Sequence, residues 1–191
     1  MDALTAVILA AGSGSRLGGV AKALLRRGEH SYLATIIATA REVGLVDAVV
    51  VVGPPYGDAI AEHARSLELR LVYNPEPARG MASSVAIGFA ALGAGTAAWL
   101  WPVDHPAVTA ATLRALVAAI GEHEVAQPRF GDRGGHPPLV ARALWARLAG
   151  CAALDGGART VIAAADVVRV AVDDPGVVRD IDTPLDLEEP A

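Results

Sequence analysis

The chain has 191 residues, 53% of them hydrophobic and 4% aromatic, and this length predicts one domain, residues 1–191, with a sizeable core. Its net charge of −5 and the absence of any Lys/Arg block exclude the electrostatic signature of a nucleic-acid partner. Because no apolar run reaches the roughly 20 residues of a membrane span, no basic signal region opens the chain and Cys151 is its only cysteine, we expect a cytoplasmic protein with no membrane partner and no internal disulfide.

Apolar segments of strand length alternate along the chain with segments of helical pattern. The predicted strands are Ala6–Ala10, Ala48–Val52, Arg70–Tyr73, Ala97–Pro102, Glu124–Gln127 and Val167–Val172. The predicted helices are Tyr32–Val43, Asp58–Ser66, Met81–Leu92, Thr109–Ile120, Arg142–Leu148 and Ala158–Ala165. This alternation predicts a three-layer α/β fold with a mostly parallel sheet, and near-continuous apolar strands are expected where helices cover both faces.

Two helix starts and one irregular stretch can also be predicted. Asp58 and Thr109 stand where a side chain can cap the following helix. Residues 128–140 (PRFGDRGGHPPLV) have turn chemistry with short extended flanks, so we expect a hairpin or a loop excursion over the sheet.

The first strand runs into a glycine-rich loop, VILAAGSGSRLGGVAK from Val7 to Lys22, which has the chemistry of a phosphate site. Gly12 and Gly14 place no Cβ between the chain and a ligand and permit positive φ angles. Successive backbone N–H groups in such a loop form a concavity that binds anions. Arg16 can grip phosphate oxygens with two N–H groups, and Lys22 supplies a compact positive charge.

Two better-known glycine loops do not fit this spacing. A P-loop closes on Gly-Lys-Ser/Thr, whereas Gly19 is followed here by Val20-Ala21-Lys22. A dinucleotide fingerprint needs a third glycine or alanine where Leu17 stands, and an acidic residue after the second strand. The remaining alternative, a plain strand-to-helix turn, would not need both cations.

A second candidate motif follows the strand that ends at Pro102. Asp104 can hold a hard cation, since Mg²⁺ takes one or two protein carboxylates and leaves its other positions to phosphate and water. The alternative is that Asp104 caps the next helix, but Thr109 lies nearer to that helix start. Because ligands of open α/β sheets bind at the carboxyl ends of strands, we expect Asp104 and the first loop to converge.

A third candidate lies where Asn74-Pro75 is followed by Gly80-Met81-Ala82-Ser83-Ser84 at a helix start. The free N–H groups and hydroxyls there can meet an anion or a nucleobase. The alternative is that Ser83 is only a helix cap.

The first loop resembles the N-terminal motif of the MobA-like nucleotidyltransferases, close to LAAGxGxRxGxxK. The residues that fall in register are Leu9, Ala10, Ala11, Gly12, Gly14, Arg16, Gly18 and Lys22. Sugar-phosphate nucleotidyltransferases and isoprenoid cytidylyltransferases share its outline. The resemblance implies a Rossmann-like three-layer fold of the nucleotide-diphospho-sugar-transferase type.

Further motifs of that family match along nearly the whole chain. Residues 80–84 resemble G-M-x-S-S, and residues 180–187 resemble the closing D-I-D-T-P-E-D-L. Residues 134–138 resemble G-x-x-G-H-P, and the middle motif L-x-D-M-P is matched by Asp104 and Pro106 but not by His105.

The resemblance assigns roles to these residues. Asp182 would be the second ligand of the Mg²⁺ held by Asp104, with Ile181 buried beside it; the alternative is that Asp182 or Thr183 caps the terminal helix. His105 and His136 would contact the acceptor; the alternatives are a solvent-facing loop histidine and a turn histidine. The catalytic residues would be Arg16 on the outer phosphates, Lys22 on the α-phosphate, and Asp104. The nucleotide would be bound by Leu9, Ala10, Ala11, Gly12, Ser13, Gly14, Ser15, Arg16, Lys22, Asn74, Gly80, Ser83, Ser84, Pro102 and Val103.

The form Leu-Ala-Ala-Gly is similar to that of the molybdenum-cofactor cytidylyltransferases, whereas guanylyltransferase relatives carry Leu-Ala-Gly-Gly. The resemblance therefore implies transfer of CMP from CTP to molybdopterin cofactor, with pyrophosphate released, and transient contact with a molybdoenzyme or its chaperone. Two alternatives stay open: another phosphorylated acceptor, such as a sugar phosphate or phosphorylated alcohol, and a non-catalytic nucleotide-binding regulatory or chaperone subunit. Intact Lys22, Asp104 and Asp182 favour an enzyme.

Overall fold

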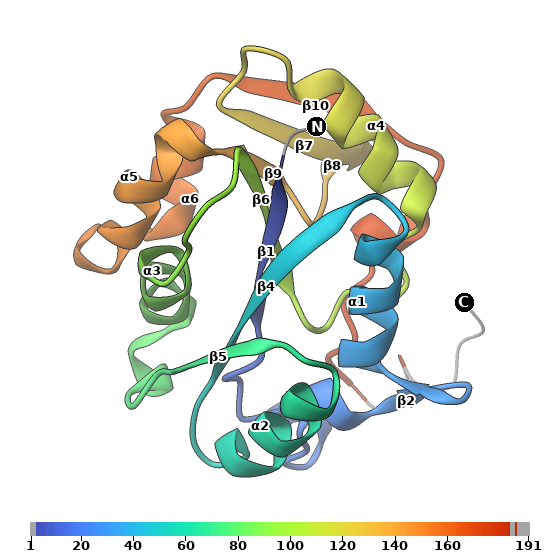
Figure 1. Cartoon of the computed structure of the whole chain (residues 1–191), viewed down its shortest axis with the longest axis vertical. Helices are drawn as coiled ribbons and strands as arrows, with labels where there is room; N and C mark the ends of the chain where they lie inside the picture. Colours follow the sequence, from blue (N-terminus) through green and yellow to red (C-terminus); the bar gives the residue numbers. More distant parts are fainter. Residues whose placement is uncertain (1–2, 184–185, 187–191) are drawn as a thin grey trace.

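The computed structural model describes residues 3–183 and 186, in which eight strands form one mixed sheet (Figure 1). The order across it is β10-β7-β9-β6-β1-β4-β5, with β8 paired to β7. The strands are β1 Leu4–Leu9, β4 Leu45–Val52, β5 Arg70–Tyr73, β6 Ala97–Pro102, β7 Val125–Phe130, β8 Arg133–Gly134, β9 Leu139–Ala141 and β10 Val167–Ala171. All neighbouring pairs are parallel except those that involve β8 and β9.

Helices cover both faces of the sheet, which gives the three expected layers (Figure 1). Helices α1 Tyr32–Arg41, α2 Gly57–Ser66 and α4 Ala110–Ile120 pack on one face. Helices α3 Met81–Ala90, α5 Trp145–Ala149 and α6 Ala158–Ala163 pack on the other. Within the described residues, no helix has both the length and the apolar character needed to cross a membrane.

Strand β1 is the centre of the sheet and the reason why a site forms at its end. Its alternate residues serve the two cores, since Ala6 and Ile8 face one set of helices while Val7 and Leu9 face the other. The chain first adds β4 and β5 on one side of β1, and then returns through α3 to add β6 on the other side. Leu9 and Pro102 are paired at the ends of β1 and β6. This change in strand order is where open α/β sheets bind their ligands.

The predicted strands and helices are present, with ends shifted by a few residues. Thr109 caps α4 as expected, because its Oγ1 accepts from the Thr112 N–H at 3.4 Å. The cap predicted at Asp58 is wrong. Helix α2 already begins at Gly57, so Asp58 lies in its first turn, where its charge favours the helix dipole instead.

The expectation for residues 128–140 needs a correction. Strands β7 and β8 do form a hairpin, but Leu139–Ala141 is not an excursion over the sheet; as β9 it lies inside the sheet, antiparallel to both β6 and β7. Leu139 and Val140 are fully buried on opposite faces, which explains why so short a strand is held there. A second hairpin, β2 Arg26–Arg27 with β3 His30–Ser31, was not expected.

Helix α3 packs closely on the sheet at Gly88. A Cβ built on Gly88 would lie 2.3 Å from Val7 Cγ1 and 3.0 Å from Val51 Cγ2, so Gly88→Ala must push α3 away from β1 and β4. We expect a loss of about 1–3 kcal/mol of unfolding free energy, as for other overpacked cores. Urea denaturation measures it. Gly93→Ala is the matched control, since a Cβ there has nothing within 4 Å; equal stability of the two variants would contradict this packing.

Candidate nucleotide site

The loop after β1 has the sharp backbone turn that the glycines predict. Gly14 adopts φ 57°, and a Cβ on it would lie 2.1 Å from the carbonyl oxygen of Val20. The Gly14 carbonyl accepts from Leu17 N at 2.9 Å and from Gly19 N at 3.0 Å, which closes the loop on itself. Gly12 has no positive φ, and a Cβ there would face open space beside the cavity. Gly14 shapes the loop, whereas Gly12 leaves room for a ligand.

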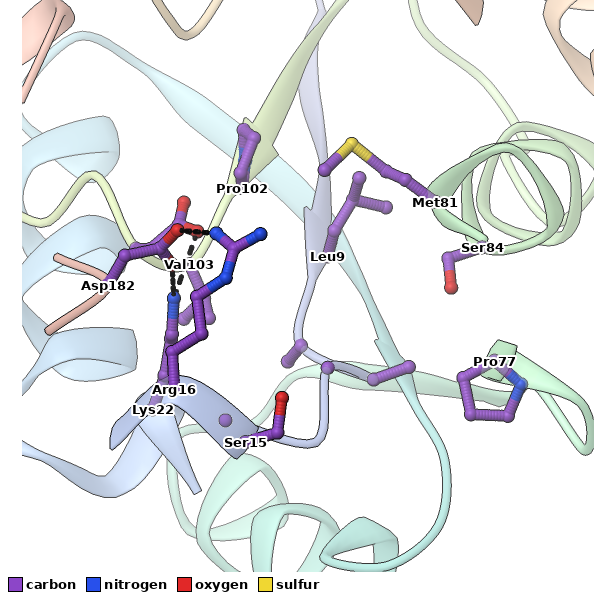
Figure 2. Close-up of a pocket in the computed structure, with 15 residues that line it drawn as sticks. Leu9, Ser15, Arg16, Lys22, Pro77, Met81, Ser84, Pro102, Val103 and Asp182 are labelled. Carbon is purple, nitrogen blue, oxygen red and sulfur yellow. Dashed lines mark hydrogen bonds and ion pairs between the residues drawn. The ribbon is translucent and has the colours of Figure 1, made fainter. Parts of the chain in front are cut away.

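A cavity of about 330 Å³ opens between this loop and the carboxyl ends of β1 and β6. Figure 2 shows the cationic side chains on one side of it, with Pro77 and Ser84 opposite. The predicted site residues that line it are Leu9, Ala10, Ala11, Gly12, Gly14, Ser15, Arg16, Lys22, Ser84, Pro102, Val103, Asp104 and Asp182. Pro77 and Met81 also line it and were not predicted as site residues, although Met81 stands inside the G-M-x-S-S motif.

Lys22 joins the three motifs of the site. Its ammonium donates to Asp104 Oδ2 at 3.3 Å and also to Asp182 Oδ1, while Arg16 Nη1 donates to Asp182 Oδ2 at 2.5 Å (Figure 2). The Lys22 side chain is only 14% exposed, whereas that of Arg16 is 76% exposed. Asp104 and Asp182 therefore converge as expected, and the positive charge between them is the Lys22 ammonium.

Both carboxylates are held in the ionised form. Burial acts to raise the pKa of Asp104, but the hydrogen bond and charge of His105, together with Lys22, bring that pKa below its usual value. His105 Nδ1 lies 2.9 Å from Asp104 Oδ1. The hydrogen bond from Lys22, supported by Arg16, lowers the pKa of Asp182. The site thus presents two ionised carboxylates near neutral pH, whose oxygens can act as metal ligands.

This pair has the donor chemistry that a hard cation requires. Within residues 3–183 and 186, no three His, Cys, Asp or Glu side chains cluster in a way that could hold a metal, so a cation here would draw its other ligands from phosphate and water.

The Asp182 side chain does not cap a helix, as the alternative proposed, because it pairs with Lys22 and Arg16. Instead, Asp186 Oδ2 accepts from the N–H groups of Asp182 and Thr183, at 3.0 and 2.6 Å.

Asn74 is buried and holds the first turn of α3 in place through its side-chain amide. It is 1% exposed, and its Nδ2 donates to the hydroxyls of Ser83 and Ser84, each at 2.9 Å. Ser83 Oγ donates to the Gly80 carbonyl at 2.8 Å, so Ser83 is not the helix cap that the alternative proposed. The predicted site residues Asn74, Gly80 and Ser83 do not line the cavity; the buried Asn74 positions Ser84, which does line it.

A proline-walled hollow of about 840 Å³ adjoins the loop on the side away from Asp104. It shares Ala11, Gly12 and Pro77 with the first cavity, and predicted site residue Ser13 lies here instead. Residues 75–79 form its opposite wall.

On the other side of the carboxylates lies a cavity of about 450 Å³ that contains both predicted acceptor histidines. His105 is 7% exposed, so it is not a solvent-facing loop residue, and its ring centroid lies 5.0 Å from that of His136. His136 Nδ1 is buried without a partner in the described part of the chain; burial, aided by the charge of His105, lowers the pKa of His136 to about 4. Arg133 and Asp180 also line this cavity and were not predicted as site residues. Arg133 gave no sequence signal because it lies in an exposed hairpin.

Comparison with known proteins places this geometry in a family. The model of the MobA-like NTP transferase domain matches residues 6–170. A curated relative is nicotine blue oxidoreductase of Paenarthrobacter nicotinovorans, 29% identical over 169 residues that span 85% of this chain and 82% of that protein.

Solved structures show the same fold. Rv0371c from Mycobacterium tuberculosis H37Rv has a TM-score of 0.79 at 26% identity, covering 97% of this chain and 96% of that one. Its manganese complex has a TM-score of 0.76 at 25% identity, with 97% and 96% covered. A nucleotidyl transferase from Methanothermobacter has a TM-score of 0.78 at 21% identity, with 98% and 95% covered.

The family model spans the phosphate loop, the strand end that carries Asp104 and the histidine loop, and the structural neighbours have the nucleotide-diphospho-sugar-transferase fold. The chain belongs to the MobA-like NTP transferase family of nucleotidyltransferases.

Proposed function

We propose that the protein transfers CMP from CTP to a phosphate monoester acceptor, molybdopterin cofactor, and releases pyrophosphate. The observation that carries the proposal is the Lys22 ammonium, which lies at the mouth of the phosphate loop and is shared by Asp104 and Asp182. This arrangement supplies both a cation for a triphosphate and carboxylates for a hard metal ion.

The transfer needs positioning more than acid–base chemistry. An oxygen of the acceptor phosphate attacks the α-phosphorus of CTP, and the bond from that phosphorus to the bridging oxygen breaks, so that pyrophosphate leaves with the electron pair. The second pKa of a phosphate monoester is about 6, so the nucleophile is already ionised near neutrality and no general base is required. What the site must provide is charge stabilisation along the line of attack.

The position of each site residue suggests which part of the nucleotide or metal it would contact. Lys22, largely shielded from solvent, would contact the α-phosphate, and the exposed Arg16 would reach the outer phosphates. Asp104 and Asp182 would hold Mg²⁺, which when bound neutralises charge on the phosphates. The manganese complex of the mycobacterial neighbour supports a divalent cation in this family.

The choice of CTP rests on Ala11 in Leu-Ala-Ala-Gly. Ala11 is 4% exposed and lines both the phosphate cavity and the hollow beyond it, so it stands where a base would enter. The acceptor would occupy the histidine cavity, which shares Asp104 and Asp182 with the phosphate cavity. Molybdopterin as acceptor is supported by the family resemblance alone, and a sugar phosphate or phosphorylated alcohol is the alternative.

The curated relative favours a second candidate, because its name describes a redox reaction. A nicotinamide cofactor could place its diphosphate on the same loop. The sequence argues against this candidate, because the dinucleotide fingerprint needs a third glycine or alanine where the larger Leu17 stands, and Leu17 is buried. A non-catalytic nucleotide-binding subunit is disfavoured by the complete set of Lys22, Asp104 and Asp182.

The nucleotide panel tests the proposal directly. With Mg²⁺ and molybdopterin cofactor, pyrophosphate should be released much faster from CTP than from GTP, because Ala11 matches the motif Leu-Ala-Ala-Gly of the cytidylyltransferases. Release is measured for all four ribonucleoside triphosphates at equal concentration, with and without the pterin. GTP turnover equal to that with CTP would refute the cytidylyl assignment. Oxidation of NADH or NADPH by a dye, with no pyrophosphate from any nucleotide, would favour the redox candidate.

Lys22 can be probed chemically because it is the only lysine in the chain. Acetic anhydride should modify its ε-amine slowly, since the ammonium is paired with two carboxylates, and CTP should slow the modification by about ten-fold or more, as a charge-assisted contact would. Mass spectrometry follows the reaction, and the N-terminal amine is the internal control. Equal rates with and without CTP would remove Lys22 from the nucleotide site.

Asp104→Asn and Asp182→Asn test the shared cation. Each should lower turnover by about 10²–10³, the usual effect of losing one preorganised electrostatic contact. Because both would serve one ion, the double variant should lose much less than the product of the single effects. Asp47→Asn, which breaks a surface pair with Arg70 on a strand outside the site, is the control and should leave turnover unchanged. Multiplicative losses, or normal turnover of Asp182→Asn, would mean that the cation is held by Asp104 alone.

A further inference from the structure

Another cavity lies outside the site described above. It is next to the start of α1 and the β2–β3 hairpin, whose place in the fold can be found in Figure 1 from the β2 label. Its volume is about 430 Å³, within the range of about 300–1,000 Å³ that is usual for small-molecule sites. Its walls come from the hairpin, the start of α1, the loop after Asp104 and the segment after η6, a 3₁₀ turn at Pro175–Val177. The lining side chains that carry a charge or a hydroxyl are Arg26, Arg27, Tyr32, Arg179 and Asp186.

We call this hollow the basic cavity, because its described lining includes three arginines and one aspartate although the chain as a whole is acidic. The Arg26 side chain donates to the backbone carbonyl of Glu29, and the Arg27 side chain makes no hydrogen bond or ion pair with the described residues 3–183 and 186. The single acidic wall residue, Asp186, directs its carboxylate to Thr183, whose N–H and Oγ1 donate at 2.6 and 2.8 Å. Arg179 is engaged, since its Nη2 donates to the backbone carbonyl of Asp186 at 3.4 Å, so the Arg26 and Arg27 guanidinium groups of the hairpin are the ones that no carboxylate of the described residues pairs with.

The charges of two of these arginines reach the same hydroxyl group. Tyr32 is 3% exposed, and its burial raises the pKa of its hydroxyl. The positive charges of Arg27 and Arg179 act on that hydroxyl in the opposite sense. Arg27 and Arg179 lie more than 150 residues apart in sequence, on the hairpin and on the segment after η6, so the fold brings them together here.

The same two chain segments line the nucleotide site. In the stretch from 179 to 182, Asp180 and Asp182 face the cavities of the nucleotide site, whereas Arg179 and Ile181 face the basic cavity. Lys22 likewise begins the short 3₁₀ turn η2, Lys22–Leu24, that leads directly into the hairpin. The two cavities are thus separate but share their supporting backbone.

We propose that the basic cavity is a second anion-binding site, which takes the phosphate groups of a small phosphorylated molecule. Guanidinium groups match phosphate oxygens in fixed two-point contacts, and the buried Tyr32, which lines the cavity, carries a hydroxyl that can donate as well. The site is independent of the proposed transfer reaction, because none of its residues lines the nucleotide or histidine cavities.

Pyrophosphate titration of the ¹⁵N-labelled full chain tests this, with constant ionic strength maintained by NaCl. The backbone amides of residues 25–28 and 179–181 should shift and saturate. In the Arg26→Gln/Arg27→Gln double variant, those shifts should require about ten-fold more pyrophosphate or more, as expected for lost charge-assisted contacts. The Arg159→Gln/Arg169→Gln double variant, which removes the same two charges from exposed arginines on α6 and β10, should behave as the unmodified chain does.

The location of the shifts separates the two sites. Pyrophosphate at the nucleotide site moves the amides of residues 12–16, and those shifts should survive in the double variant whatever reaction the enzyme catalyses. Shifts at the hairpin that grow without saturation, or that citrate reproduces at the same concentration, would overturn a phosphate site. So would the absence of hairpin shifts in the full chain.

Discussion

The ammonium of Lys22 between Asp104 and Asp182 is the interaction on which the site depends. Two carboxylates this close would otherwise compete, and one would keep its proton. His105 together with Lys22 keeps the pKa of Asp104 below its usual value despite its burial, and Lys22 with Arg16 does the same for Asp182. The contacts link positions 82 and 160 residues apart, so one side chain ties the first loop, the end of β6 and the closing segment together.

The same charge balance explains how an acidic chain could bind a triphosphate. Arg16 and Lys22 are the donors that phosphate oxygens would use, and both are engaged by carboxylates here. A bound triphosphate that drew these cations away would leave Asp182 without a cation and Asp104 with His105 as its remaining side-chain partner. A divalent ion arriving with the nucleotide would then restore neutrality, which gives a physical reason to expect metal and nucleotide to bind together.

Sequence patterns predicted the layers of the fold because each central strand is apolar on both faces and each helix has a buried face. The shared edge of parallel strand ends predicted that the first loop and Asp104 converge, and the family resemblance added Asp182 to them. They did not predict β9, because three residues show no periodicity, nor the role of Asn74, whose effect runs through Ser83 and Ser84. The cavity residues Arg133 and Asp180 could not be found because their position is set by long-range packing.

The position of Asp182 depends on another buried carboxylate, Asp174. Asp174 is 4% exposed; its Oδ2 accepts from the Thr109 N–H at 2.9 Å and from the Thr112 hydroxyl at 2.6 Å, and its Oδ1 from the Gly176 N–H at 3.0 Å. These bonds fasten the segment after β10 to the start of α4.

From that anchor the chain runs back along the loop of β6, where Ile181 N donates to the Asp104 carbonyl at 2.9 Å. Val177, at the start of this run, accepts from the His136 N–H at 2.7 Å, so the same segment also positions the histidine loop. The geometry between the two aspartates is therefore set by backbone hydrogen bonds and a helix-end anchor, which leaves their side chains available for a cation. Exposed side chains alone would lose this precision to conformational entropy.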